Sequence, residues 1–439
     1  MKILWGSEQP TRPTGYAVVT REIIKRLVER GHEVHCIGWD YNGEPFKHEE
    51  GWTMLHAGLK GFGAERLGNM NAPTVLENHL MTIKPDIYVS LIDPWFIGHA
   101  VLSTNHFRVP YAAYLPIDGF PISYAWKDIL KMLHTPIWMS EFGANVFGNF
   151  VHEYSSLGKV APEMREPILD RYLTDVGRVI YHGVDVEKFH PITEEEKEEA
   201  KQTLGVSEFD FLFLSVAKNT NRKQYPRLLE AFSLMLEMEG IDREKTGLLI
   251  HCGDAVDSMG MNGWNLPLLA QQLGIGDNVR FTDVGNPLYG MTPEQMALMY
   301  ALSDVHVLST GGEGFGVPTA ESMACGVPVI LPDNTTGPEL VGAESSPEVS
   351  VGQRGWLVPC VTHITGPKWG VNMKLVDVHS LAIAMHHAYS DESVRTEMGR
   401  NSRDFAVESL DWEKIVDQFE EELQRISDTP HPLGENARR

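Results

Sequence analysis

Residues Val305 to Pro332 read VHVLSTGGEGFGVPTAESMACGVPVILP, and this stretch decides the fold. Its apolar start predicts a buried strand over 305–308, and a second apolar run predicts another strand over 327–331. Between them lie four glycines and then a segment that has Pro318 near its start and Gly326 at its end, which is the pattern of a short helix. A strand, a glycine-rich loop, a helix and a strand in this order are typical of a parallel α/β sheet.

The chemistry of this loop favours a ligand that carries both phosphate and hydroxyl groups. Glycines let the backbone come close to a ligand, and the start of a helix presents N–H groups and a positive dipole end that suit a diphosphate. Glu313 flanks the loop and Glu321 follows in the first helical turn, and carboxylates accept hydrogen bonds from hydroxyls. These features together describe a site for a nucleotide sugar. A carboxylate in a first turn is also a common dipole partner, so that interpretation of Glu321 stays open.

One pattern in this stretch resembles the E-x7-E signature of retaining glycosyltransferases of the group 1 family, also called family 4. The residues that carry the resemblance are Glu313, Gly314, Phe315, Gly316, Pro318 and Glu321. The resemblance implies an α/β fold of GT-B architecture, with two Rossmann-like, doubly wound domains facing a central cleft. It also implies that Glu313 contacts hydroxyls of the sugar, that Glu321 holds the ribose, and that the backbone of 314–316 binds phosphate.

A cluster of cations follows another predicted buried strand, over 209–216. The family carries an Arg here and, five residues on, a Lys, and Lys218 and Lys223 match that spacing. The resemblance therefore implies that these lysines neutralise charge on the departing diphosphate, which is electrostatic stabilisation of the transition state. A lysine lacks the bidentate phosphate contact of an arginine, and Arg222 is the candidate to replace it. A solvent-exposed cluster without this role is the alternative.

The first half of the chain opens as a second doubly wound sheet. It predicts a strand over 2–5, a loop over 6–15, a helix over 16–30 and a strand over 33–38. The loop lacks G-x-G-x-x-G, which disfavours a nicotinamide cofactor. The resemblance places such a loop over the donor phosphates and the acceptor, with Gly15 and Tyr16 at the matching positions. A plain turn between strand and helix is the alternative.

Two aspartates end further predicted strands of this half. Asp93 follows a strand over 87–92 and Asp118 follows one over 110–116, and ligands in open α/β sheets bind beyond such strand ends. The resembling family often has a His near the position of Asp118, where it touches the transferred sugar. Asp118 is therefore a catalytic candidate that departs from the family pattern, and a turn before Gly119 is the equally supported alternative. His182 is interpreted as a packed residue and Asp185 as a structural turn residue.

Bulk composition narrows the class of protein. The chain has 439 residues, of which 42% are hydrophobic. A chain of this length is too long for one ordinary core, so two domains are predicted. The sequence shows no apolar run of membrane-spanning length and no signal peptide, so we expect a cytoplasmic protein, either free or peripheral at a membrane. The net charge of −23 disfavours nucleic acid as a partner. Four widely spaced cysteines favour neither a zinc site nor a disulfide framework.

The predicted domains follow from these elements. We expect an acceptor-binding domain over 1–191, a nucleotide-sugar-binding domain over 192–405, a helix over 406–427 that crosses back to the first domain, and a disordered tail over 428–439. The span 342–374 is rich in Gly, Pro and Ser and is expected to be a surface excursion that touches the acceptor or a partner. By the resemblance, the strand end at 279–283 lies near the nucleotide base.

The sequence thus predicts a retaining, metal-independent hexosyltransferase. Its donor is expected to be a UDP-, GDP- or ADP-sugar, its acceptor a glycan, lipid or small molecule, and it needs no cofactor besides the donor. The expected catalytic residues are Lys218, Lys223, Glu313 and Asp118. The expected donor-binding residues are Gly15, Arg222, Gly314, Phe315, Gly316, Val317, Thr319 and Glu321. Two alternatives remain: a GT-B epimerase of nucleotide sugars, which needs no acceptor, and a non-catalytic nucleotide-sugar-binding protein. The base, the sugar, the acceptor and the oligomeric state stay open.

Overall fold

The chain forms two compact units. The computed structural model describes residues 1–39, 41–59, 64–66, 72–156, 172, 175–257, 260, 262–282, 291–366, 370–431 and 433–434. Unit 1 comprises Met1–His182 together with Trp412–Arg439, and unit 2 comprises Gly183–Asp411. The domain boundary predicted near Pro191 therefore falls inside unit 2, and the last helix groups with the N-terminal half of the chain.

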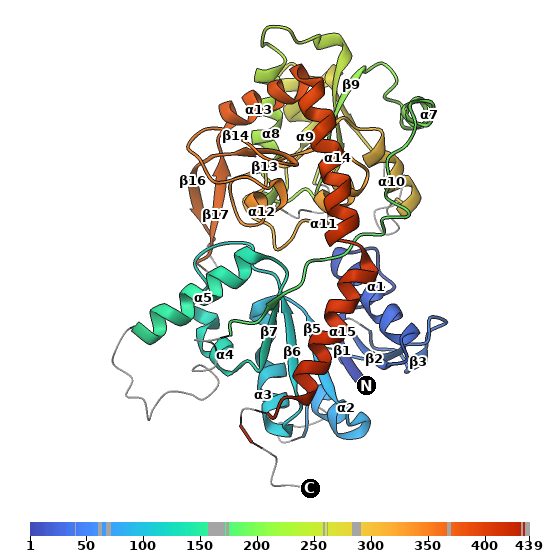
Figure 1. Ribbon diagram of the computed structural model, residues 1–439, viewed down its shortest axis with the longest axis vertical. Coiled ribbons are helices and arrows are strands. Elements are labelled where there is room, and N and C mark those ends of the chain that lie inside the picture. Colours follow the sequence, from blue (N-terminus) through green and yellow to red (C-terminus); the bar gives the residue numbers. More distant parts are fainter. Residues whose placement is uncertain are drawn as a thin grey trace. The chain divides into compact units, whose positions relative to one another are not determined.

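Unit 1 is built on a mostly parallel sheet in the order β3-β4-β2-β1-β5-β6-β7-β8 (Figure 1). Among the described strands of unit 1, only β3 and β4 pair in antiparallel fashion. The strands are β1 (Lys2–Glu8), β2 (Glu33–Trp39), β3 (Phe46–Lys47), β4 (Thr53–His56), β5 (Ile87–Leu91), β6 (Tyr111–Leu115), β7 (Thr135–Trp138) and β8 (Arg178–Val179). The central strands β5, β6 and β7 are buried at every position, as expected for a parallel sheet covered on both faces.

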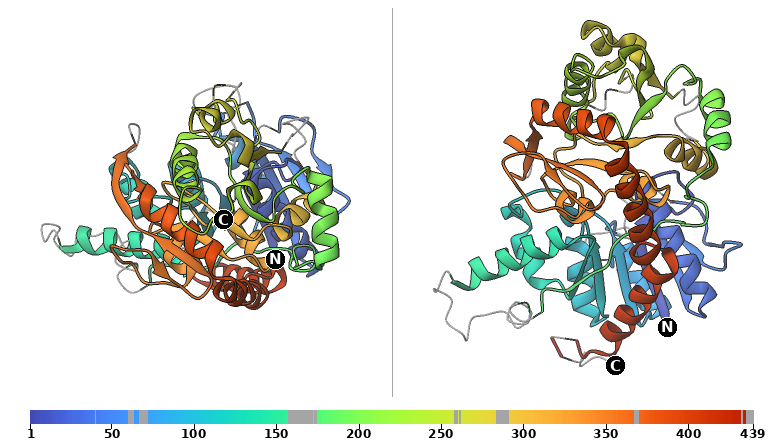
Figure 2. Two further views of the ribbon diagram at one scale, coloured as in Figure 1. Left: turned by 90° about the horizontal axis from the view of Figure 1, so that it is seen from above. Right: turned by 45° about the horizontal axis from the view of Figure 1, so that its top comes forward.

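Helices cover this sheet, and the last helix of the chain is one of them. The helices of unit 1 are α1 (Gly15–Glu29), α2 (Val75–Ile83), α3 (Gly98–Phe107), α4 (Lys127–Met132), α5 (Glu141–Ser156) and α15 (Trp412–Asp428). In Figures 1 and 2, α15, in red, lies across the strands of unit 1. Its Phe419 packs between two strand residues, with ring centroids 6.3 Å from Trp5 and 4.9 Å from Tyr114. Aromatic burial therefore fixes α15 on the sheet.

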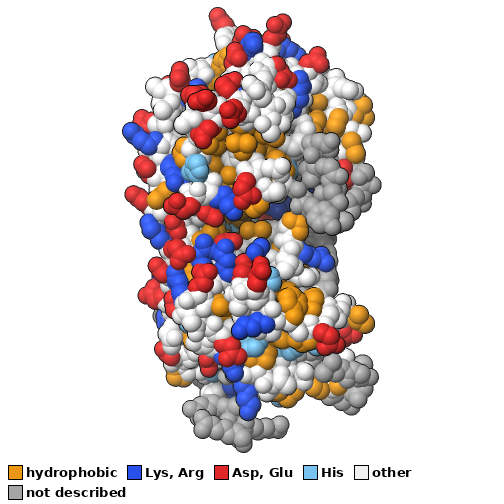
Figure 3. Space-filling model, turned by 90° about the vertical axis from the view of Figure 1, so that its right-hand side faces the viewer, with side chains coloured by type: hydrophobic (Ala, Val, Ile, Leu, Met, Phe, Trp, Pro, Cys, Tyr) orange, Lys and Arg blue, Asp and Glu red, His pale blue; other side chains and the backbone are white. Residues whose placement is uncertain are grey.

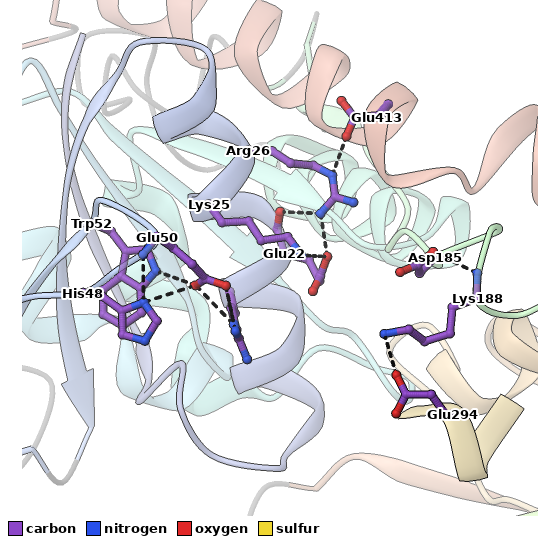
Figure 4. Close-up of polar contacts among 11 residues, drawn as sticks. Glu22, Lys25, Arg26, His48, Glu50, Trp52, Asp185, Lys188, Glu294 and Glu413 are labelled. Atoms are coloured by element: carbon purple, nitrogen blue, oxygen red, sulfur yellow. Dashed lines mark hydrogen bonds and ion pairs between the residues drawn. The ribbon is translucent and has the colours of Figure 1, made fainter. Parts of the chain in front are cut away.

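Ion pairs between α1 and α15 surround this apolar contact. Figure 4 shows Arg26 of α1 pointing to Glu413 of α15, and the Nε to Oε1 distance is 2.7 Å. Arg30 Nη1 lies 2.7 Å from Asp417 Oδ1 on the next turn of α15. The acidic partners are 63% and 70% exposed, so solvent screens these pairs and they add little to stability.

Unit 2 repeats the design with a sheet in the order β11-β10-β9-β12-β13-β15-β14. Its strands are β9 (Phe211–Val216), β10 (Thr246–His251), β11 (Val279–Phe281), β12 (Val305–Val307), β13 (Val329–Pro332), β14 (Ser350–Val351) and β15 (Gly355–Val358). Its helices are α7 (Glu194–Leu204), α8 (Tyr225–Met235), α9 (Leu266–Gln272), α10 (Pro293–Ala301), α11 (Val317–Ala324), α12 (Gly337–Val341), α13 (Val378–Ser390) and α14 (Glu392–Ser409). Local capping signals define several of these bounds, such as the capping boxes at Thr193 and Thr292.

The span expected as a surface excursion carries regular structure. Strand β16 (Cys360–Thr365) pairs with β17 (Asn372–Val376) in an antiparallel ribbon. The side chains of β16 are exposed beyond Cys360, which agrees with a surface position. Strands β16 and β17 therefore form a β-ribbon, whereas β15, within the same span, is a buried strand of the main sheet of unit 2.

Both sheets have a point where the order of strands reverses. In unit 1 the chain leaves β1 toward β2 on one side and later adds β5, β6 and β7 on the other side. In unit 2, β9 lies in the same way between β10 and β12. Ligands of open α/β sheets bind outside the carboxyl ends of the strands at such a switch point. The loops after β1 and β5, and those after β9 and β12, are therefore the places to look for a site.

The helices of the described residues also bear on the membrane question. None of them combines the length with the apolarity that a membrane span requires. The cytoplasmic location stays a prediction from the sequence.

Candidate functional site

The glycine-rich loop of unit 2 connects β12 to α11 at the switch point. Gly316 is the N-cap of α11 and has a φ of 108°, a conformation that side chains disfavour and glycine adopts without strain. Pro318 has no N–H and the N–H of Thr319 donates to the Gly316 carbonyl at 2.9 Å, so the N–H groups of Gly316 and Val317 are the ones that this helix start offers to an anionic ligand. Pro318 occupies the first turn, where its missing N–H costs nothing.

Backbone contacts hold this loop against the loop after β9. The N–H of Gly311 donates to the carbonyl of Arg222 at 2.7 Å. The carbonyl of Gly311 accepts from Asn334 Nδ2 at 2.6 Å and from the N–H of Lys374 at 3.0 Å. A Cβ on Gly311 would lie 3.1 Å from the Lys374 carbonyl oxygen, so the close approach of β17 requires a glycine here. The loop is thus fixed by three neighbouring segments.

Glu313 lies between two cations in this loop. Lys223 Nζ is 2.5 Å from Oε1, and Arg222 Nη1 is 3.1 Å from Oε2. The N–H of Glu313 donates to Thr335 Oγ1 at 3.0 Å. Burial favours the neutral carboxyl, but Lys223 and Arg222 outweigh it and lower the pKa of Glu313 to about 2. The group is ionised at neutral pH, and the cluster combines a carboxylate with two cations.

Glu321 has different surroundings, although it lies on the helix that the loop begins. The hydroxyl of Tyr300, on α10, donates to Glu321 Oε2 at 2.9 Å. Burial raises the pKa of Glu321 to about 7, and the hydrogen bond from Tyr300 offsets this only in part. Both protonation states of Glu321 are therefore populated near neutral pH. Tyr300 carried no sequence signal, because its partner comes from another helix.

The structure brings together some of the predicted residues and separates others. Arg222, rather than Lys218, joins Lys223 at Glu313, and Lys218 is exposed after β9. Gly314 and the buried Phe315 lie in the loop. Val317 begins α11, and the buried Thr319 lies in its first turn. The remaining two, Gly15 and Asp118, lie in unit 1, at the start of α1 and after β6. The reactive roles of these residues stay predictions.

Other polar residues of unit 2 fill structural positions. His306 of β12 is fully buried, and burial lowers its pKa to about 3, which agrees with a core residue. His251 Nδ1 lies 2.7 Å from Thr282 Oγ1, at the strand end expected near the base. Asp283 lies outside the described residues. Asp185 accepts from the N–H of Lys188 at 3.1 Å, as expected for a turn residue.

The described part of the chain holds no group of three or more His, Cys, Asp or Glu side chains that could bind a metal ion. On the face shown in Figure 3, Lys and Arg side chains lie among Asp and Glu rather than in a continuous basic patch.

Relatives in sequence point to one family. Residues 196–363 match the model of the family described as glycosyl transferases group 1. The D-inositol 3-phosphate glycosyltransferase of Geodermatophilus obscurus is 32% identical over 177 residues, which are 40% of this chain and 37% of that protein. An uncharacterized glycosyltransferase of Methanocaldococcus jannaschii is 23% identical over 419 residues, which are 93% of this chain and 94% of that protein. The chain spans 34–40% of the length of the first curated relatives it matches.

Solved structures extend the likeness over both units. The sucrose-phosphate synthase from Thermosynechococcus elongatus has a TM-score of 0.68 at 18% identity, covering 97% of this chain and 99% of that one. HepE of Anabaena, in complex with UDP-glucose, has a TM-score of 0.66 at 17% identity, covering 97% and 100%. These likenesses establish the fold, which is the GT-B fold of two Rossmann-like units. Residues 196–363 of unit 2 match the group 1 glycosyltransferase family, in line with the resemblance inferred from the sequence.

Proposed function

We propose that the protein is a retaining glycosyltransferase that moves a hexose-type sugar from a nucleotide sugar to a hydroxyl acceptor. The observation that carries the proposal is the ionised Glu313 held between Arg222 and Lys223, directly before the amino terminus of α11. This arrangement offers cations and helix N–H groups to a diphosphate and a carboxylate to sugar hydroxyls. HepE of Anabaena, whose fold is similar, has been solved in complex with UDP-glucose, and this supports a nucleotide sugar as the donor.

The proposed reaction is a substitution at the anomeric carbon of the donor sugar. The bond from this carbon to the phosphate oxygen breaks, and a bond to the acceptor oxygen forms on the same face. The proton of the acceptor hydroxyl passes to the departing phosphate. Negative charge therefore grows on the leaving diphosphate, and positively charged or N–H groups that stabilise this charge lower the barrier.

Three groups of unit 2 are suited to receive that charge. Lys223 and Arg222 already lie at Glu313, and 33% of the Arg222 side chain is exposed, so part of its guanidinium can reach a ligand. The first turn of α11 adds backbone N–H donors. Lys218 is a further cation whose long side chain lies at the surface after β9. Because these groups supply positive charge, the proposed reaction needs no metal ion.

The two carboxylates have separate roles in this proposal. Glu313 accepts hydrogen bonds from sugar hydroxyls, and the two cations keep it ionised for that purpose. Glu321 accepts from the ribose hydroxyls, which favour its ionised form. In unit 1, Gly15 and Asp118 are proposed to contact the donor phosphates and the transferred sugar.

A panel of nucleotide sugars tests the proposal. UDP-, GDP- and ADP-sugars are screened by thermal shift, because a bound donor stabilises the folded protein by mass action. The donor that stabilises is then incubated with glycan, lipid and small-molecule acceptors. We expect release of the nucleoside diphosphate and a product whose anomeric configuration, read by NMR, matches that of the donor.

Three results would contradict the proposal. Inversion of configuration excludes the retaining mechanism. A changed sugar in the donor without any acceptor indicates an epimerase. Tight donor binding that survives Glu313→Ala and Lys223→Ala, without nucleotide release under any acceptor, indicates a non-catalytic binding protein.

A further inference from the structure

The switch point of unit 1 carries a connected set of aromatic side chains. Trp39 ends β2, and Trp95 and Phe96 belong to the short helix η1 (Pro94–Phe96) that follows β5. The rings of Trp39 and Phe96 are 4.8 Å apart and nearly perpendicular, at 86°. Trp95 lies 6.0 Å from Phe96 and 5.5 Å from Trp126. We call these four residues the aromatic row.

The aromatic row is buried at Trp126 and exposed at Phe96, which contacts both Trp95 and Trp39. Trp126 is 7% exposed and supports Trp95 from within the unit, whereas Phe96 is 38% exposed. Exposure alone does not distinguish Phe96, because Phe46 on β3 is 39% exposed. The position of Phe96 distinguishes it from Phe46, because the aromatic row lies beyond the carboxyl ends of β2 and β5, the strands on either side of β1. Rigid aromatic side chains at such a point are typical of a ligand site.

Hydrogen-bonding groups lie at the same strand ends. The hydroxyl of Tyr16, in the first turn of α1, donates to Asp93 Oδ1 at 2.9 Å. Asp93 directly precedes η1, so this bond joins the loop after β1 to the loop after β5. Thr14, which caps α1, donates to the carboxylate of Glu8 at the end of β1. Two oriented carboxylates therefore accompany the aromatic row.

This combination fits a neutral sugar ring. The faces of aromatic rings are negative and attract the polarised C–H groups of a pyranose, while carboxylates accept hydrogen bonds from its hydroxyls. The charges of Glu8 and Asp93 disfavour a phosphate group on a sugar that stacks on the aromatic row, and the carboxylates disfavour a purely apolar ligand. We propose that unit 1 binds a neutral sugar ring stacked on the aromatic row, with its hydroxyls at Asp93. The acceptor is then a glycan or glycoside, a conclusion that rests on the proposed function.

Ligand-detected NMR on the full chain tests the proposal. Saturation transfer is measured for methyl α-glucopyranoside, methyl β-glucopyranoside and maltose, with glucose 6-phosphate and benzyl alcohol as the anionic and the apolar comparison. We expect transfer to the neutral sugars, strongest at the C–H protons of one ring face. Phe96→Ala should weaken their binding by about tenfold, because the stacking surface is lost. Phe46→Ala, which removes an equally exposed ring from β3, should leave binding unchanged.

Several outcomes would overturn the proposal. These are no transfer to any neutral sugar, stronger transfer to glucose 6-phosphate or benzyl alcohol, and equal binding by wild type and Phe96→Ala. Thermal unfolding of each variant checks the fold, and Asp93→Asn provides a second test that should weaken sugar binding while the donor-induced thermal shift persists. Failure of the proposed function looks different: the glycosides bind, but no nucleotide sugar does. If transfer to a lipid occurs and glycosides give no signal, the function stands and this inference falls.

Discussion

In unit 2 the loops after β9 and β12 bring Arg222 and Lys223 to a carboxylate, whereas in unit 1 the loops after β1 and β5 bring the aromatic row to Asp93. Both sets lie at the switch point of a doubly wound sheet. The topology therefore decides where side chains converge, and the residues at the strand ends decide what they bind. Cations suit a diphosphate, and aromatic faces with a carboxylate suit a neutral sugar.

A second contrast lies within unit 2. Glu313 and Glu321 belong to one loop and the helix that follows it, yet the pKa of Glu313 is lowered to about 2 and that of Glu321 is raised to about 7. Burial acts on both groups in the same direction. The difference arises from the partners, since two cations face Glu313, whereas among the described residues the hydroxyl of Tyr300 faces Glu321.

The largest effect is expected from Lys223→Ala. The substitution leaves the buried carboxylate of Glu313 with Arg222 as its remaining cation, which should lower the free energy of unfolding by about 3 kcal/mol. If the proposed function holds, kcat should also fall by roughly 100-fold, because charge on the leaving group is less well met. Urea unfolding and nucleotide release measure the two effects separately.

Lys218→Ala is the matched control. Lys218 is exposed, so its removal should change the free energy of unfolding by less than about 0.5 kcal/mol. Equal destabilisation by the two substitutions would show that the ion pair of Lys223 with Glu313 does not stabilise the folded protein. A loss of turnover in Lys218→Ala at unchanged stability would support its predicted contact with the leaving group.

The fall in the free energy of unfolding at acidic pH should depend on Glu313. Its pKa is about 2 in the folded state and 4.5 ordinarily, so between these values the folded state binds fewer protons than the unfolded state. Its stabilising contribution is complete above pH 4.5 and is lost as the pH falls toward 2, by about 2–3 kcal/mol. Glu313→Gln should flatten this part of the pH profile in urea unfolding. Glu33→Gln, at an exposed carboxyl whose pKa is also lowered, should leave the slope unchanged.

Glu321 should act in the opposite direction. Its folded-state pKa of about 7 lies above 4.5, so the folded state binds more protons between these values. The contribution of Glu321 is therefore complete below pH 4.5 and is lost as the pH rises through 7. Glu321→Gln should be more stable than wild type at pH 8 by on the order of 3 kcal/mol, and the gain should fall to about 1 kcal/mol or less at pH 5. A gain of equal size at both pH values would contradict the raised pKa.

The smallest effect is expected in unit 1, from Tyr16→Phe. The substitution removes the hydrogen bond to Asp93 at the switch point but keeps the ring. A part-buried bond of this kind contributes about 1 kcal/mol. Thermal unfolding should show this loss, and sugar binding should weaken if the bond orients Asp93. Unchanged sugar binding in a destabilised variant would limit the bond to a structural role.

Elements with local signals could be predicted from the sequence. Helices α7 and α10 each begin at a capping box, which is a signal that lies within a few residues of the chain. The glycine-rich loop and α11 were predicted for a similar reason, since glycines and Pro318 act through their own backbone geometry.

Contacts between distant segments could not be predicted. Arg222 and Glu313 are separated by 91 positions, and the pairing of β9 with β12 brings them together, so the sequence analysis could name Arg222 as a cation for the diphosphate but not its contact with Glu313. The hydrogen bond from Tyr300 to Glu321 and the aromatic row likewise depend on packing between elements. Periodicity along one segment carries no information about such pairs.

The central claim is that a donor sits between Glu313 and Glu321, and NMR titration of ¹³C-labelled glutamate side chains tests it most directly. The two signals are assigned with Glu313→Gln and Glu321→Gln. We predict pKa values of about 2 and about 7 in the free protein, and a fall of at least about one unit for Glu321 when a stabilising nucleotide sugar is bound, because ribose hydroxyls favour its ionised form. A Glu321 titration that no bound nucleotide sugar changes would contradict the account.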